Sequence, residues 1–143
     1  MWSFGNPLKN KKARMTALDK ACRLLTMQLL GAKESERFIE DGKSRWPLGY
    51  CFGLLQASLE ALDATVTPQQ SDYDSHIKTG FGRVFGDEAF GVIQYHVSLS
   101  SWRDEQFQAG RIAGATEYVQ IWNTKSDRAF GLAQYLSGNA QKE

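Results

Sequence analysis

The chain has 143 residues and a mass of 16.1 kDa, the size of one ordinary domain that can bury a core without disulfide bridges or structural metals. Hydrophobic residues make up 42% of the sequence and charged residues 23%, which excludes an intrinsically disordered chain. Its 17 basic and 16 acidic side chains leave a formal net charge of +1, so no overall field would draw the molecule to nucleic acid or anionic lipid.

The first predicted helix covers residues 8–31, where apolar residues recur at spacings of three and four before the stop signal Gly31. Its buried stripe is expected to contain Met15, Leu18, Cys22, Leu25 and Leu29. A short charged helix over residues 33–41, ended by Gly42, is predicted to follow as a surface connector.

The next helix is predicted to begin at Ser44, because Pro47 is tolerated only in a first turn, and to continue to about Ala64. Apolar residues occupy most of its circumference, so we expect it at the centre of the core. Residues 65–71, which include Pro68, form the expected loop.

A helix over residues 73–85 is predicted to end at Gly86, and Asp87 is well placed to cap a helix over 88–100. No stretch alternates with period two for long enough to predict a strand, although 91–99 is rich in β-branched and aromatic residues.

The segment 104–122 is predicted to be a long helix, and Ser126 or Asp127 to cap a final short helix that stops at Gly138. We therefore predict an all-α fold, a compact bundle of about six or seven helices in which residues 1–143 form a single domain. The ends of the chain, 1–7 and 138–143, are expected to be loosely ordered.

Glycines are unusually frequent inside the predicted helices, and six of the eight phenylalanines precede a glycine directly. A helical glycine costs about 1 kcal/mol relative to alanine, so each should have a packing reason. Small residues four apart share one helix face and let a neighbouring backbone approach. Such sets are Gly49, Gly53 and Ala57, then Gly82 and Gly86, then Gly110 and Gly114.

Two interpretations of these glycine faces remain open. Most helix faces in a domain of this size are used internally, so the faces can be ordinary helix crossings within the chain. Alternatively, one face forms a two-fold interface between identical subunits. The contact surface predicted for such a homodimer consists of Trp102, Phe107, Gly110, Gly114 and Trp122.

The candidate metal ligands are Asp72, Asp74, His76 and His96, with Asp72 and His76 on one helix face. A zinc site needs three or four N or S ligands, and neither CxxC nor HExxH spacing occurs, so no metal or cofactor is predicted. A capping Asp72 with a solvent-facing or core-satisfied His76 is favoured instead.

No catalytic residue is predicted, because no GxSxG elbow surrounds any serine and the two thiols, Cys22 and Cys51, lie in apolar patterns typical of a core. Cysteines of this kind favour a reducing compartment. A buried pocket that held His76 or His96 beside a carboxylate would revive an enzymatic hypothesis.

The amino-terminal part of the chain is basic and also holds Trp2 and Phe4. Such a cluster can contact phosphates while an aromatic ring stacks on a base, although a solvated helix face explains it equally. The candidate nucleic-acid-binding residues are Lys9, Lys11, Lys12 and Arg14.

Four segments resemble successive helices of small bacterial proteins of unknown function, some of them encoded on mobile gene cassettes. The first contains the motif GYCFGLLQA at residues 49–57, and the others cover 80–91, 107–122 and 131–136. The resemblance extends over about positions 44–137 and is carried by packing glycines and aromatics. It implies an all-α, often dimeric fold and transfers no catalytic residue.

We therefore expect a non-enzymatic binding or interaction protein that forms a homodimer. No apolar run has signal-peptide length or approaches the roughly 20 residues of a membrane span, so a cytoplasmic location without membrane contact is predicted. The alternatives are a nucleic-acid-binding accessory protein and an immunity-like or antitoxin-like protein that binds an unknown protein partner.

Overall fold

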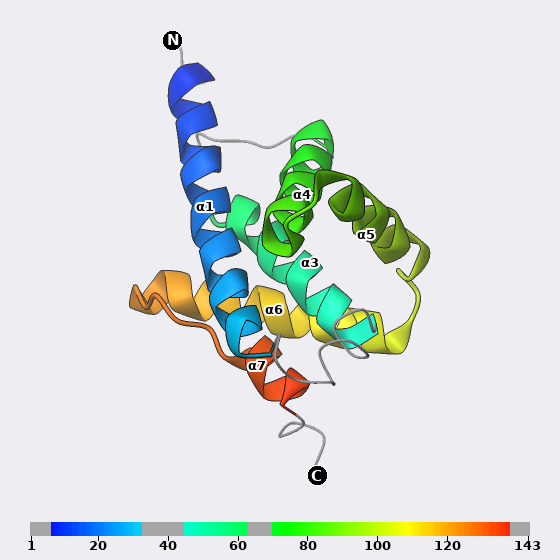
Figure 1. Ribbon diagram of the computed structural model, residues 1–143. Helices are drawn as coiled ribbons and strands as arrows, with labels where there is room; N and C mark the ends of the chain where they lie inside the picture. Colours follow the sequence, from blue (N-terminus) through cyan, green and yellow to red (C-terminus); the bar gives the residue numbers. More distant parts are fainter. Residues whose placement is uncertain (1–6, 33–44, 63–69, 138–143) are drawn as a thin grey trace.

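The computed structural model describes residues 7–32, 45–62 and 70–137, which form six α-helices and no strand (Figure 1). The all-α prediction is confirmed. The helices are α1 (Pro7–Ala32), α3 (Arg45–Glu60), α4 (Gln70–Phe85), α5 (Glu88–Ser100), α6 (Glu105–Thr124) and α7 (Gly131–Leu136).

Several predicted segments lie outside the described residues. They are the connector over 33–41, the ends at 1–6 and 138–143, and the loop at 65–69. Two helices begin earlier than these predictions allowed, because Pro7 already opens α1 and Gln70 already opens α4.

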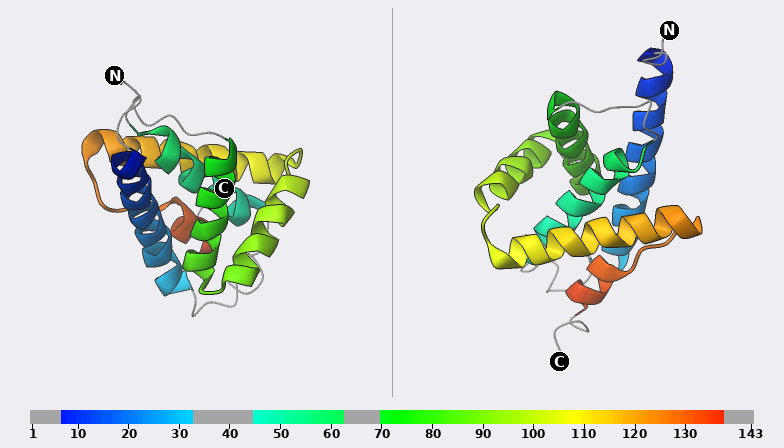
Figure 2. Two further views of the ribbon diagram at one scale, coloured as in Figure 1. Left: turned by 90° about the horizontal axis from the view of Figure 1, so that it is seen from above. Right: turned by 180° about the vertical axis from the view of Figure 1, so that it is seen from behind.

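Helix α3 is the centre of the fold, as its apolar circumference predicted. It contacts each of the other five described helices, and most of its residues are buried. Pro47 lies in its first turn, where the missing N–H leaves no helical hydrogen bond unmade. Figures 1 and 2 show α1 and α5 on opposite sides of the molecule, with α6 crossing behind the other helices in the view of Figure 1.

The α3–α6 crossing is built from four glycines, Gly49 and Gly53 on α3 and Gly110 and Gly114 on α6. A β-carbon at any of them would lie 1.9 to 2.2 Å from a main-chain oxygen of the facing helix. The oxygens belong, in the same order, to Phe107, Arg111, Trp46 and Tyr50. Each helix therefore offers its glycine face to the backbone of the other, and the predicted close approach occurs within the chain.

Glycines also shape the α4–α5 hairpin. Gly86, with φ 75°, ends α4, and Asp87 then caps α5 by accepting a hydrogen bond from the backbone N–H of Phe90 at 3.1 Å. A β-carbon at Gly91 would lie 2.3 Å from the backbone N of Gly82. Of the two glycines predicted to share a packing face, Gly82 does allow the close approach of α5. Gly86 instead forms the turn, and no atom lies within 4 Å of its hypothetical β-carbon.

Helix α7 is capped by side chains from two other helices. The backbone N–H groups of Phe130 and Gly131 donate to the Glu117 carboxylate of α6 at 2.7 and 3.0 Å. Those of Leu132 and Ala133 donate to Oε1 of Gln28 of α1 at 2.8 and 3.0 Å. The prediction that Ser126 or Asp127 caps this helix is wrong, because both lie in the non-helical stretch 126–130 and the helix begins only at Gly131.

The buried stripe of α1 begins one turn later than predicted. Met15 is 55% exposed, whereas Leu18, Cys22, Leu25 and Leu29 are buried. The first turns of α1 project beyond the other helices in both Figure 1 and Figure 2. Met15 lines the open groove between α1 and α4 instead of the core. The buried hydrophobic residues of α1 lie between Ala17 and Leu29.

Candidate interaction surface

The predicted contact residues fall into two groups. Phe107, Gly110 and Gly114 are buried at the α3–α6 crossing, so their place in a surface between subunits is corrected to a crossing within the chain. The sequence could not decide this, because a helix wheel does not say which neighbour a glycine face meets. Trp102 and Trp122 are 40% and 44% exposed and remain available to a partner.

The opposite side of α6 carries an exposed row of uncharged residues, which we call the α6 outer stripe. It consists of Ala109, Ile112, Thr116, Val119 and Asn123, at successive spacings of three and four. Ile112 is 58% exposed, and Trp122 flanks the row. Seen from behind (Figure 2, right), α6 runs across the front of the molecule with no described helix over it.

The charged side chains in the body of α6 are held by partners within the chain. Arg111 donates to the side-chain oxygens of Gln108 at 2.7 Å and Gln56 at 3.2 Å. The Glu117 carboxylate accepts from Tyr50 and from the first N–H groups of α7. Neither charge belongs to the α6 outer stripe, so that surface is electrically neutral as well as partly apolar.

Helix α5 has a comparable exposed face with Val92, Ile93, Val97 and Leu99. It carries no charged residue after Glu88 and packs mainly on α4. Exposed apolar residues grouped on one helix are unusual at a free surface and typically mark a contact. The face is shorter than the α6 outer stripe, because α5 has 13 residues and α6 has 20.

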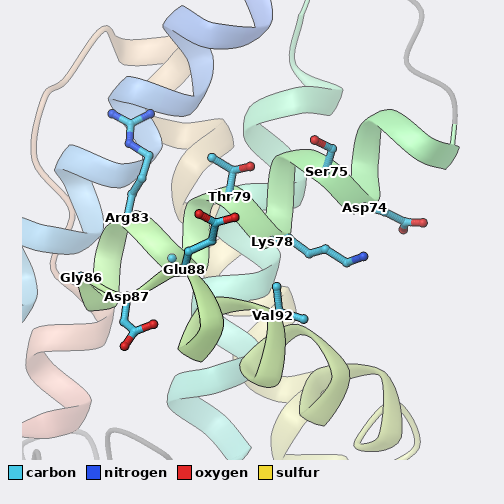
Figure 3. Close-up of a pocket in the computed structure, with 10 residues that line it drawn as sticks. Asp74, Ser75, Lys78, Thr79, Arg83, Gly86, Asp87, Glu88 and Val92 are labelled. Atoms are coloured by element: carbon cyan, nitrogen blue, oxygen red, sulfur yellow. The ribbon is translucent and has the colours of Figure 1, made fainter.

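An open groove of about 830 Å³ lies between α4 and α5 (Figure 3). Two of its charged groups are already used: Arg83 pairs with Asp19 of α1 at 2.7 Å, and Asp87 caps α5. Figure 3 shows Arg83 and Lys78 extending away from each other. The side chains do not converge on one point, so the groove offers no set of catalytic groups.

His76 lines a smaller groove of about 350 Å³ between α1 and α4, which Asp72 also lines. The Ser58 hydroxyl donates to the Leu55 carbonyl at 2.7 Å, so its oxygen accepts from Nε2 of His76 at 2.8 Å. A nucleophilic serine would instead donate to the imidazole, and Ser58 is fully buried. Burial, reinforced by the charge of Arg14, lowers the pKa of His76 to about 4, too low for an efficient base at neutral pH.

The remaining reactive groups are also part of the core. Cys22 and Cys51 are free and buried, and burial raises their pKa values to about 11 and about 12. Within the described ranges, no three His, Cys, Asp or Glu side chains gather where they could hold a metal ion. His76 is thus a core histidine with a satisfied hydrogen bond, one of the two arrangements favoured from the sequence. Asp72, which was predicted to cap the helix, lies instead inside it as the third residue of α4.

Comparison of the chain with protein-family models, with curated proteins and with solved structures gives no match. None of the helices in the described part of the chain is long and apolar enough to cross a bilayer.

Proposed function

We propose that this protein is a non-enzymatic interaction protein that forms a homodimer through the α6 outer stripe. The observation that carries the proposal is the composition of that stripe. Ile112 and Val119 are exposed on a long helix, and the charges nearest to them in the sequence, Arg111 and Glu117, are engaged elsewhere in the chain. Moving such a surface out of water costs little desolvation free energy, because none of its side chains is charged. It also brings no unpaired charge into contact with a partner.

A second copy of the chain is the partner that this surface fits best. Spacings of three and four are those of a helix-pair seam, and the stripe extends for about 21 Å at roughly 1.5 Å per residue. In a two-fold contact each residue faces the same stripe, so Ile112 and Val119 meet apolar side chains and Thr116 lies near the axis. A neutral stripe avoids the like-charge repulsion that two-fold symmetry would impose on a charged one.

The test replaces one exposed isoleucine at a time. Ile112→Glu places a charge in the proposed contact, and Ile93→Glu places the same charge on α5 at a matched exposure of 55%. Sedimentation equilibrium should report a dimer for the wild type and for Ile93→Glu, and a dissociation constant at least about 100-fold weaker for Ile112→Glu. Circular dichroism checks that both variants remain helical.

Each other outcome has a defined meaning. A monomeric wild type would contradict the homodimer and favour the immunity-like or antitoxin-like alternative, in which the stripe receives a different protein. Dissociation by Ile93→Glu alone would move the interface to α5. A cysteine at the centre of the stripe adds a direct check, since Thr116→Cys should form an intermolecular disulfide while the buried Cys22 and Cys51 stay inert.

The basic first helix supports a second candidate, nucleic-acid binding. Lys11 and Lys12 are exposed on the projecting turns of α1, Arg14 is half-buried beside them, and the side chain of Lys9 lies outside what the structure describes. The acidic residue of α1, Asp19, is paired with Arg83. Binding to a DNA or RNA duplex that weakens steeply with salt, and that Lys11→Glu with Lys12→Glu abolishes, would support this candidate.

A further inference from the structure

The groove between α1 and α4 that His76 lines has a basic wall. Lys11, Arg14, Met15 and Leu18 line it from α1, at spacings of three, one and three residues. These spacings place the four side chains on one helix face, so both cations belong to the groove. We call it the α1–α4 groove, and its polar lining consists mainly of Lys11, Arg14, Ser75, His76, Thr79 and Arg83.

The facing wall, on α4, supplies two hydroxyl groups. Ser75 and Thr79 are exposed, lie one turn apart and both line the groove. In Figure 3 their side chains extend from the same side of α4 as that of Arg83, whereas Lys78 extends from another side. Arg83 bridges the two walls at one end of the groove, because it reaches Asp19 of α1 at 2.7 Å. Hydrogen-bond donors therefore lie on both walls.

The charges that line the α1–α4 groove are not all used within the chain. Three basic side chains and one acidic one line it. Arg83 is paired with Asp19, and the acidic residue, Asp72, already takes part in an interaction of its own. Among the described residues, neither Lys11 nor Arg14 has an ion-pair or hydrogen-bond partner. Two positive charges on one wall thus remain for a ligand.

His76 contributes no charge to the groove. Its Nε2–H donates to Ser58 at 2.8 Å, and burial together with the charge of Arg14 lowers its pKa to about 4. The imidazole is therefore neutral at pH 7, and the guanidinium of Arg14 lies near enough to act on it. The positive character of the groove comes from Lys11 and Arg14.

We propose that the α1–α4 groove binds a phosphate monoester, with the phosphate held between Lys11 and Arg14 of α1 and the hydroxyls of Ser75 and Thr79 of α4. At neutral pH a phosphate monoester carries nearly two negative charges and three strong acceptor oxygens. This matches two unpaired cations and two hydroxyl donors. A carboxylate or a phosphodiester carries one negative charge and would leave one of the cations unpaired.

The size and shape of the groove favour a small phosphorylated molecule over a nucleic acid. Its volume of about 350 Å³ is that of a small-ligand site. The pair between Arg83 and Asp19 bridges the walls and obstructs a polymer that would lie along the groove. The site contains no residue of the α6 outer stripe, so it does not depend on dimer formation.

The probe is phenyl phosphate, compared with phenyl sulfate, which has nearly the same shape and one negative charge. Binding is followed at about pH 7.5, where the phosphate is largely a dianion, from the NMR signals of the Ser75 and Thr79 backbone amides. We expect phenyl phosphate to bind about tenfold more tightly than phenyl sulfate.

Lys11→Gln and Lys12→Gln form a matched pair of variants. Both lysines are exposed neighbours on α1, and Lys12 does not line the groove. Lys11→Gln should weaken phenyl phosphate binding at least about fivefold, and Arg14→Gln at least about tenfold, whereas Lys12→Gln should change it by less than about twofold. Because both lysines are exposed, this pair keeps the test valid if Arg14→Gln folds poorly.

Equal weakening by Lys11→Gln and Lys12→Gln would show nonspecific attraction to the basic helix and overturn the proposal. Equal affinity for the two probes, or no saturable binding, would also overturn it. If an oligonucleotide without terminal phosphates bound as tightly and lost the same affinity in Lys11→Gln, the groove would belong to the nucleic-acid candidate instead. Repeating the titration with Ile112→Glu separates this result from the fate of the dimer, because the monomer should bind phenyl phosphate as the wild type does.

Discussion

At the scale of single residues, the glycines of the α3–α6 crossing are the positions that should tolerate substitution least. Gly53→Ala would place a β-carbon 1.9 Å from a main-chain oxygen, so the two helices must move apart. We expect unfolding by urea to show a loss of about 3 kcal/mol or more, although alanine is the better helix former by about 1 kcal/mol.

Gly80→Ala is the matched control for this prediction. Gly80 is also buried and helical, but its hypothetical β-carbon meets the side chain of Leu55, 2.5 Å away at the nearest methyl, instead of a backbone. A side chain can change its rotamer, so the change in unfolding free energy should stay within about 1 kcal/mol. Equal losses in the two variants would refute the assignment of backbone contact as the constraint.

His76 gives a pH dependence of known sign. Its pKa is about 4 in the folded chain and 6.5 for an unperturbed histidine, so the unfolded state binds the proton more tightly. Stability from this group is complete above pH 6.5, declines as the pH falls, and is reduced by about 3 kcal/mol near pH 4.

The measurement is urea unfolding between these pH values for the wild type, His76→Gln and His96→Gln. The difference in slope between wild type and His76→Gln isolates this group from the carboxylates that titrate nearby. His96→Gln removes an exposed imidazole and controls for the loss of a histidine as such. An unchanged slope in His76→Gln would show that the imidazole is not buried as described.

At the scale of elements, α7 depends on side chains that are distant in the sequence. Gln28→Ala would leave the buried N–H of Leu132 and that of Ala133 without their acceptor, at a cost of about 1–3 kcal/mol. We expect faster amide hydrogen exchange throughout α7. Asp127→Ala, at the cap position predicted from the sequence, should leave the exchange rates of α7 unchanged. Faster exchange in Asp127→Ala but not in Gln28→Ala would instead show that Asp127 caps the helix.

Local signals in the sequence predicted most of the elements and few of their contacts. Gly86 and Asp87 located the α4–α5 boundary, because a left-handed turn and an N-cap act within a few residues. The α7 cap was missed, since Gln28 and Glu117 are far from it along the chain. The small-residue faces could be recognised in the sequence. Whether they pack within the chain or against a second subunit depends on which helices are neighbours in three dimensions, which the sequence pattern does not give.

The α6 outer stripe is also visible in the sequence, on the helix face opposite the glycines. Ile112 and Val119 lie on the side of the helix opposite Gly110 and Gly114, and Arg111 and Glu117 are the charges near them. Once the glycine face is assigned inward, an apolar outer face follows from the 3.6-residue period. The resemblance to cassette-encoded bacterial proteins stays a prediction.

At the scale of the whole molecule, a homodimer links stability to concentration. If folded chains associate and unfolded chains do not, raising the protein concentration about 100-fold adds roughly 2.7 kcal/mol to the stability of the dimer. With about 2.1 cal/mol/K of unfolding entropy per residue, this should raise the melting temperature by about 4 °C. Differential scanning calorimetry across that concentration range measures the shift directly.

The same calorimetric measurement on the two isoleucine variants distinguishes a specific dimer from nonspecific association. Ile112→Glu should melt at a temperature independent of concentration, because its charge would be buried against its own symmetry mate. Ile93→Glu should keep the wild-type dependence, since α5 lies outside the proposed contact and the substituted side chain stays in water. A melting temperature that ignores concentration in all three proteins would mean that the chain unfolds as a monomer, and the neutral face of α6 would then need a partner of different sequence.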